Sequence, residues 1–172
     1  EIEQVLWEGG KRAFRWRDVL KYVRSLRKVI KRIQPDILHA GPIQTVGLIA
    51  VLTRFRPLLV MSWGFDLMED VYLNKWWERV TRFVLKRSTF FTSDAQVTRN
   101  KAVEYGMNPD RTIVFPWGVD LDHFKPNSST SSEKALTLFC NRSWEPRYGV
   151  DVLARAFVRA AQTQPNLRLI LL

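Results

Sequence analysis

Residues 58–66 read Leu-Leu-Val-Met-Ser-Trp-Gly-Phe-Asp, and this stretch decides the fold. Its first four residues form a short apolar run that predicts a buried strand, and the next five have the composition of a loop. Helical periodicity precedes the strand at 43–53 and follows it at 73–86. A strand between two helices is the repeating unit of a parallel sheet, so we expect an α/β fold.

The same alternation extends in both directions from this stretch. The predicted elements are helix 15–33, strand 37–39 (buried), helix 43–53, strand 58–61, helix 73–86, strand 89–92, helix 95–105, strand 112–115, strand 136–140, helix 150–163 and a strand from 167 onward. Ser93 and Gln96 predict a capping box at the start of the helix 95–105, and Gly106 suits the left-handed residue that ends it.

A polar run divides the chain, because the sequence Asn-Ser-Ser-Thr-Ser-Ser at 127–132 cannot bury a core. We therefore predict a Rossmann-like domain over 1–116, a linker over 117–134 and the start of a second Rossmann-like domain over 135–172. The expected fold class is α/β: a Rossmann-like parallel sheet with helices on both faces, plus the first β-α-β unit of the second domain. The first residue is not Met and the last ones form a predicted strand, so we expect truncation at both ends, with the first domain lacking its first strand.

Composition limits the partners. Lys and Arg number 27 against 17 Asp and Glu, and the net charge of +10 favours anionic partners such as nucleotide diphosphates, anionic membranes or nucleic acids. The single Cys140 excludes an intrachain disulfide, which favours a reducing compartment. No apolar run approaches the roughly 18 residues of a membrane span.

Four loops that follow predicted strands are candidates for a binding site, because ligands of open parallel sheets bind at the carboxyl ends of the strands. The loops are His-Ala-Gly-Pro at 39–42, Ser-Trp-Gly-Phe-Asp at 62–66, Pro-Trp-Gly-Val-Asp at 116–120 and Asn-Arg-Ser-Trp-Glu-Pro-Arg-Tyr-Gly at 141–149. Ordinary turn chemistry explains any one of them. Four such loops at one sheet edge favour a sugar or nucleotide pocket.

The order of these segments resembles the retaining glycosyltransferases of family 4, which have the GT-B architecture of two facing Rossmann-like domains. Residues 35–40 look like the family's strand that ends in a His-Ala pair, and 59–67 occupy the place of its His-Gly-x-Asp segment. Residues 116–126 are similar to the signature that closes the first domain, and 141–150 match the Gly-Arg loop of the second. The resemblance covers roughly residues 17 to 172.

This resemblance implies a glycosyltransferase that moves a sugar, as hexosyltransferases do, from a nucleotide-sugar donor to a glycan, lipid or small-molecule acceptor. Basic residues neutralise the leaving diphosphate in such enzymes, so we expect no cofactor and no metal, and Asp120-Leu-Asp122 is not interpreted as a metal site. Arg142 is the best match for the diphosphate contact. Because the loop is one residue longer than the common form, either Arg147 or Tyr148 aligns with the family's lysine.

The acceptor side is expected to include His39, Gly41, Trp63, Gly64, Asp66 and Gly118. Trp63 stands where the family commonly has a histidine, and tryptophan cannot shuttle a proton, so it would stack on a sugar or a lipid headgroup instead. Asp66 would accept hydrogen bonds from acceptor hydroxyls or cap the following helix, and both interpretations stay open. His39 is more simply a buried strand-end residue than a base. Which residue is catalytic stays unknown.

Other functions compete with this interpretation. A basic nucleic-acid-binding domain would explain the charge, although no binding motif accompanies it and we expect no nucleic acid. A binding-only remnant of a transferase is a further alternative, and we expect this chain alone to turn over little or no sugar nucleotide. The basic helical segment 11–32 and the aromatic residues Tyr72, Trp76 and Trp77 suit either a membrane surface or ordinary packing. The expected location is the cytoplasm, with peripheral contact at the inner face of the membrane.

Overall fold

The computed structural model describes residues 5, 7–10, 14–125 and 136–172, in two compact units, Glu1–Gly118 and Val119–Leu172. Residues 126–134, the second half of the predicted linker, lie outside the described residues.

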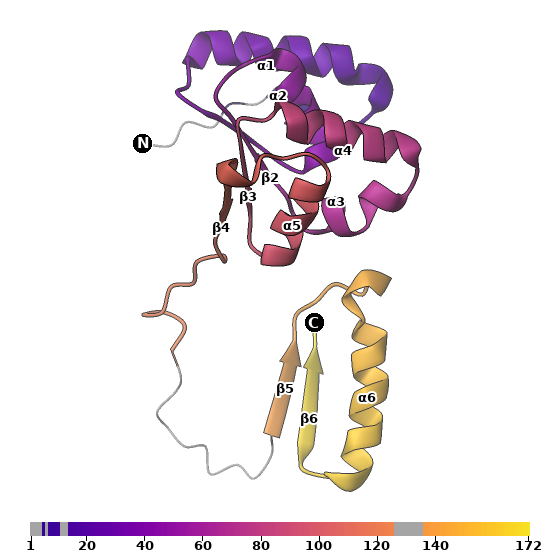
Figure 1. The fold of residues 1–172 in the computed structure, drawn as a ribbon. Helices are drawn as coiled ribbons and strands as arrows, with labels where there is room; N and C mark the ends of the chain where they lie inside the picture. The colour runs from indigo at the N-terminus through magenta and orange to yellow at the C-terminus, as the bar shows by residue number, and fades with distance from the viewer. Residues whose placement is uncertain (1–4, 6, 11–13, 126–135) are drawn as a thin grey trace. The chain divides into compact units, whose positions relative to one another are not determined.

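The first unit is built on a four-stranded parallel sheet. Its strands are β1 (Leu38–Ala40), β2 (Leu58–Met61), β3 (Phe90–Ser93) and β4 (Thr112–Val114), and they lie side by side in chain order (Figure 1). The register pairs Ala40 with Val60, and Val60 with Phe91. The predicted α/β class and parallel sheet are confirmed. Because all four strands run the same way, the loops that follow them leave from one sheet edge.

Helices connect the strands at nearly the predicted places. They are α1 (Val19–Ile33), η3 (Ile43–Gly47), α2 (Leu48–Thr53), α3 (Phe65–Met68), η4 (Asp70–Tyr72), α4 (Lys75–Arg87) and α5 (Gln96–Glu104), with short turns η1 (Glu8–Gly10), η2 (Trp16–Asp18) and η5 (Pro109–Arg111). The short α3 and η4 were not predicted. No helix of the described residues is long and apolar enough to cross a membrane.

Two of the helix starts show how side chains set the boundaries. The carboxamide oxygen of Asn74 accepts hydrogen bonds from the backbone N–H groups of Trp76 (3.0 Å) and Trp77 (3.1 Å), so α4 begins at Lys75. The predicted capping box at Ser93 is wrong: Ala95 is the N-cap of α5, and the Ser93 hydroxyl donates to the Ala95 carbonyl instead (3.1 Å).

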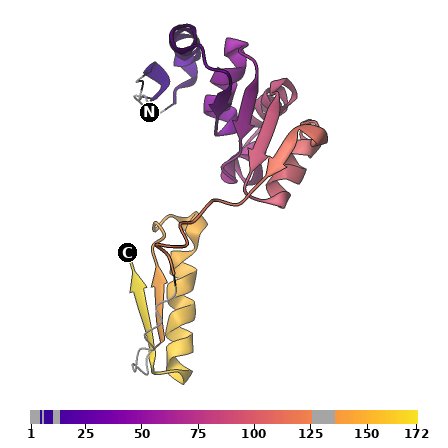
Figure 2. The ribbon, with the colours of Figure 1, turned by 90° about the vertical axis from the view of Figure 1, so that its left-hand side faces the viewer.

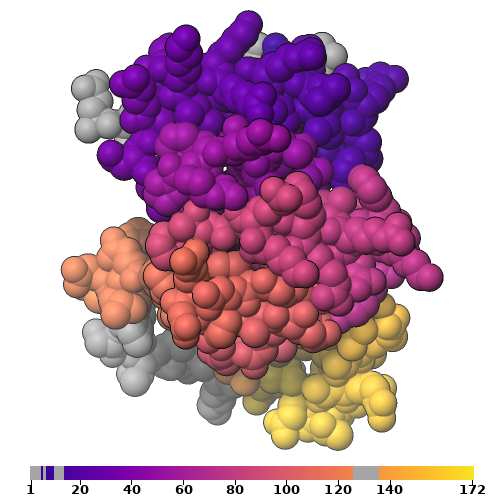
Figure 3. Space-filling model, turned by 45° about the horizontal axis from the view of Figure 1, so that its top comes forward, coloured from indigo at the N-terminus to yellow at the C-terminus, as the bar shows by residue number. Residues whose placement is uncertain are grey.

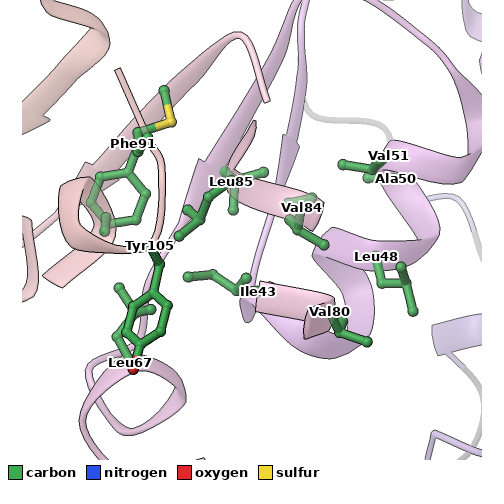
Figure 4. Packing of buried hydrophobic residues seen from close by; sticks show 14 of the residues in the cluster. Ile43, Leu48, Ala50, Val51, Leu67, Val80, Val84, Leu85, Phe91 and Tyr105 are labelled. Atoms are coloured by element: carbon green, nitrogen blue, oxygen red, sulfur yellow. The ribbon is translucent and has the colours of Figure 1, made fainter. Parts of the chain in front are cut away.

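The main core lies between the sheet and the helical segments that connect its strands, chiefly η3, α2 and α4. Phe91 of β3 packs with Ile43 of η3 and with Val84 and Leu85 of α4 (Figure 4). Val60 of β2 belongs to the same cluster. These side chains are at most 1% exposed. Buried and less buried residues alternate along β2, as expected for a strand that packs one face on a core. This packing fixes the sheet edge from which the candidate loops leave.

Helix α1 packs against α2 through a second apolar cluster. Tyr22, Val23 and Leu26 of α1 contact Ile49 of α2, as its helical periodicity predicts. In the space-filling view the indigo surface of α1 adjoins the violet surface of η3 and α2 (Figure 3). The basic side chains of α1 are exposed, and Arg27 among them reaches the carbonyl oxygens of Leu52 and Thr53 at the end of α2.

The second unit is one β-α-β unit. Strands β5 (Leu136–Cys140) and β6 (Leu167–Leu171) are parallel, and α6 (Val150–Thr163) lies along them (Figure 2). β5 and α6 have the predicted bounds. Among the described residues of this unit, Val150 is the only apolar side chain in the buried class.

Candidate functional site

The loop after β2 is held by the carboxylate of Asp66, which lies in the first turn of α3 and is 0% exposed. Its Oδ1 accepts hydrogen bonds from the Ser62 hydroxyl (2.5 Å) and from the backbone N–H groups of Trp63 and Leu67 (both 3.1 Å). Its Oδ2 accepts from the Ile43 N–H (3.0 Å), so it joins the loop after β1 to the loop after β2.

A buried glutamine extends this network to the neighbouring helix. The Gln44 side-chain amide donates to the Asp66 carbonyl oxygen (2.5 Å) and to the Thr81 hydroxyl (2.9 Å) of α4. The Thr81 hydroxyl in turn donates to the Trp77 carbonyl oxygen (2.9 Å). These bonds satisfy polar groups that burial would otherwise leave without partners, so the loop after β2 has a fixed shape.

The environment of Asp66 explains its role. Burial raises the pKa of this carboxyl above its usual 3.8, and the hydrogen bonds from Ser62, Ile43, Trp63 and Leu67 oppose that shift. Asp66 does not cap α3, because the N-cap of that helix is Gly64 and has no side-chain cap. The donors around its carboxylate belong to the protein itself, which makes Asp66 a positioning residue for the loop.

Gly41 and Trp63 bring the first two loops into contact. A Cβ on Gly41 would lie 2.5 Å from the Met61 carbonyl oxygen and 3.0 Å from Nε1 of Trp63. The indole of Trp63 also makes an edge contact with the Phe65 ring, with 6.4 Å between centroids, and remains 56% exposed. The loops after β1 and β2 therefore present a flat aromatic surface beside a glycine.

We predict that Gly41→Ala lowers the free energy of unfolding by about 1–3 kcal/mol, because the new methyl group has no space against the Met61 backbone. Gly118→Ala is the matched control, since a Cβ there meets no atom within 4 Å, and we expect a change below about 0.5 kcal/mol. Urea unfolding followed by tryptophan fluorescence measures both. Equal midpoints for the two variants would contradict the close packing of Gly41.

The remaining acceptor-side residues differ in how they are placed. His39 is exposed, so its interpretation as a buried strand-end residue is wrong: β1 is the outer strand of the described sheet, and His39 alternates with the more buried Leu38 and Ala40. Gly64 has φ of +89°, a backbone conformation that favours glycine. Gly118 lies at the end of the first unit with open space around it.

In the second unit, the loop after β5 places a cation beside a helix N-terminus. The guanidinium of Arg142 lies over the ring of Tyr148, 5.6 Å from its centroid. Gly149, with φ of +63°, then turns the chain into α6. The Arg142 side chain is thereby oriented by an aromatic ring one residue before this turn.

The other charges of this loop are partly paired. Nε of Arg147 lies 3.2 Å from the Glu145 carboxylate, and Asp151 in the first turn of α6 pairs with Arg155 (2.6 Å). The hydrogen bond from Arg155 lowers the pKa of Asp151, helped by the backbone N–H of Val152. Asp151 thus already uses part of the positive end of α6, which leaves Arg142 as the principal cation for an anionic ligand.

The structure groups the predicted residues into two sets. Gly41, Trp63, Gly64 and Asp66 come together at the loops after β1 and β2, and Arg142 comes together with Tyr148 in the loop after β5. Sequence reasoning missed Ser62 and Gln44, which hold the first set in place. The position of Ser62, four residues before an acid in a candidate loop, could have indicated its bond to Asp66. Nothing in the sequence indicates that Gln44 is buried, because polar residues on helices are usually exposed.

The first unit is a Rossmann-like α/β unit whose loops place glycine and tryptophan at the carboxyl edge of a parallel sheet, where open α/β sheets bind their ligands. Residues 5–123 match the Glycosyltransferase Family 4 domain, and the chain belongs to this family. The predicted family membership is confirmed.

Individual relatives agree with this assignment. Over 93 residues the chain is 32% identical to a D-inositol 3-phosphate glycosyltransferase of Geodermatophilus obscurus, a match that covers 49% of this chain and 20% of that protein. The fold is similar to that of Anabaena Alr3699/HepE in complex with UDP and glucose, with a TM-score of 0.69 and 18% identity over 93% of this chain and 45% of that one. The same protein in complex with UDP-glucose gives a TM-score of 0.61 at 17% identity, covering 89% and 42% of the two chains. This chain therefore spans a fifth of the curated relative and less than half of the solved chains.

Proposed function

We propose that this chain is part of a glycosyltransferase that transfers a sugar from a nucleotide-sugar donor to an acceptor. The observation that carries the proposal is the family match over residues 5–123. The Anabaena structures, which contain UDP with glucose or UDP-glucose, support a donor of this chemical class.

Arg142 is proposed as the principal contact of the donor diphosphate. When the bond from the sugar to the diphosphate breaks, the leaving oxygen gains negative charge. A guanidinium offers two parallel N–H groups to phosphate oxygens, and the ring of Tyr148 restricts where this guanidinium lies. Arg147 supplies a weaker second charge, because Glu145 partly neutralises it. Basic side chains thus do the work that a divalent metal does elsewhere, and no cofactor enters the proposal.

The acceptor is proposed to lie against the loops after β1 and β2. The exposed indole of Trp63 suits stacking on the apolar face of a sugar ring, Gly41 packs closely against this indole, and the open space beside Gly64 leaves the approach free. Asp66 acts only through the loop that it holds, because its carboxylate is buried. The acceptor is a glycan, lipid or small molecule that presents a hydroxyl group.

The protein is proposed to work in the cytoplasm, at times in contact with the inner face of the membrane. A single cysteine suits a reducing compartment, and the net charge of +10 favours an anionic surface.

Binding of sugar nucleotides tests the proposed function. We expect tryptophan fluorescence to show saturable binding of one among UDP-, GDP- and ADP-sugars, with little change between two salt concentrations. Single-stranded DNA is the comparison ligand. If DNA binds more tightly than every sugar nucleotide and its affinity falls steeply with salt, the chain is a nucleic-acid binder instead.

A further inference from the structure

An apolar groove of about 540 Å³ runs between α1, α2 and α4 of the first unit. It is lined by Trp16 of η2, Val19 of α1, Leu48 and Leu52 of α2, and Trp76 and Phe83 of α4, among others. Arg79 is its one charged lining residue. The groove exists because α1 and α4 both pack beside the short α2 without closing over it.

A second hollow, of about 550 Å³, adjoins this groove and is strongly basic. Its lining includes Arg27, Arg54, Arg56 and Arg87, and no acidic residue. Leu52 and Phe83 line both hollows, so the basic pocket and the apolar groove are neighbours on this surface. One end of a single ligand would meet guanidinium groups and the rest would meet hydrocarbon.

Backbone and ring contacts hold three of the four guanidinium groups in place. Arg27 donates to the carbonyl oxygens of Leu52 (2.9 Å) and Thr53 (3.4 Å), and Arg56 donates to those of Phe55 (3.0 Å) and Arg87. The guanidinium of Arg87 lies over the Phe83 ring, 4.8 Å from its centroid. The ion pairs recorded for the described residues involve other basic side chains, so these four charges are not neutralised by carboxylates there.

The basic pocket lies at the opposite sheet edge from the proposed acceptor loops. Arg54 and Arg56 precede β2 and Arg87 precedes β3, at the amino ends of parallel strands. The acceptor loops follow the carboxyl ends of those strands. The four arginines are therefore separate from the proposed acceptor site.

The apolar groove extends from beside the basic pocket along α4 toward two exposed tryptophans. From Arg87 back to Trp76, α4 extends about 16 Å at 1.5 Å per residue. Trp16 and Trp76 lie edge to face, 5.8 Å between centroids, and remain 39% and 56% exposed. Tryptophans exposed at the end of an apolar channel are typical of contact with the interface of a lipid bilayer.

We propose that these two neighbouring hollows together bind an anionic phospholipid of a bilayer, with the phosphate on the four arginines and an acyl chain in the apolar groove. Charge complementarity selects the headgroup, because several guanidinium groups without carboxylate partners favour a headgroup with net negative charge over a zwitterionic one. The apolar lining selects a hydrocarbon chain over a peptide, since it offers almost no hydrogen-bonding groups to a backbone. The site is independent of sugar-nucleotide binding.

Lysophosphatidylglycerol is the soluble probe for this site, with vesicles of phosphatidylglycerol or phosphatidylcholine as the membrane probes. We expect Arg54→Gln/Arg87→Gln to weaken binding of lysophosphatidylglycerol by about tenfold or more. Trp76→Ala, at an exposed position, is expected to weaken it by about fivefold. The matched control is Lys28→Gln/Lys31→Gln, which removes the same charge from the outer side of α1 and is expected to change binding by less than about twofold.

Three results would overturn the proposal. Equal losses for the arginine and lysine pairs would show diffuse attraction between charges. Equal affinity for glycerol phosphate and lysophosphatidylglycerol would show a simple anion site. Equal binding of phosphatidylcholine and phosphatidylglycerol vesicles would show that the arginines do not distinguish the two headgroups. Circular dichroism checks folding, and Arg54→Lys/Arg87→Lys restores the charge if the glutamine pair unfolds. Sugar-nucleotide binding of the same variants is expected to be unchanged. A failure of the lipid proposal can therefore be distinguished from a failure of the proposed transferase function.

Discussion

Arg142→Ala, introduced into the complete parent chain, is expected to lower kcat/KM for sugar transfer by about tenfold or more. The side chain lies at the start of the loop after β5, held over the ring of Tyr148 at 5.6 Å. Removing it takes away the cation that would meet the charge developing on the leaving diphosphate. The loss is expected mainly in kcat, because this charge is greatest in the transition state. Steady-state kinetics with the preferred sugar nucleotide measure it.

Two variants make the Arg142 test specific. Arg159→Ala removes an equally exposed arginine from α6, far along the helix from the loop, and we expect unchanged kinetics. Arg142→Lys keeps the charge but loses the paired N–H geometry, so an intermediate rate is expected. If Arg142→Ala transfers sugar as fast as the unaltered protein, Arg142 has no role in holding the diphosphate.

Asp66→Ala is expected to lower the free energy of unfolding by about 2–5 kcal/mol, because buried donors lose their acceptor. The Ile43 N–H and the Ser62 hydroxyl lie in fully enclosed positions, and no water replaces the missing carboxylate easily there. Asp110→Ala is the control, since this exposed carboxylate accepts no hydrogen bond from the described residues and only the backbone N–H of Asp110 is bonded, to Asn108. Urea unfolding measures both variants, and a loss for Asp66→Ala no larger than for the control would contradict the network.

The pH dependence of stability gives a second test of Asp66. Burial raises its pKa above 3.8 in the folded protein, so the folded state binds this proton more tightly than the unfolded chain does. The resulting contribution to stability is fully present below pH 3.8 and is lost as the pH rises through the folded pKa. The stability of the protein relative to Asp66→Asn, which does not titrate, is therefore expected to fall with rising pH. A rise would show that the hydrogen bonds outweigh burial.

Much of the fold follows from short-range patterns in the sequence. Strand β2, strand β5 and helix α6 have the bounds that their apolar runs and helical spacing predict. Local patterns succeed here because a parallel strand is a compact apolar run and the helices bury one stripe. The failures are also local: Ser93 has the right residue type for a capping box, but the chain turns into α5 at Ala95.

The candidate site was less predictable because its residues meet through the fold. In the sequence, Asp66 looks like an acid that binds a ligand. Only the structure shows that the backbone N–H of Ile43, in the segment between β1 and β2, donates a hydrogen bond to its carboxylate. His39 looks buried in sequence because its neighbours are apolar, yet β1 is an outer strand of the described sheet. The four arginines of the basic pocket are distributed between positions 27 and 87, so no sequence pattern identifies them as a group.

The second unit contains little of what normally makes a domain self-supporting. Its two strands and one helix leave Leu136, Phe139 and Ile170 exposed, and Val150 is the one described apolar side chain there in the buried class. A polypeptide limited to this unit would lack the cooperative melting of an independent domain. We therefore expect the loop that presents Arg142 to become more rigid when another protein surface packs on those strands, and the proposed donor affinity to increase with such packing.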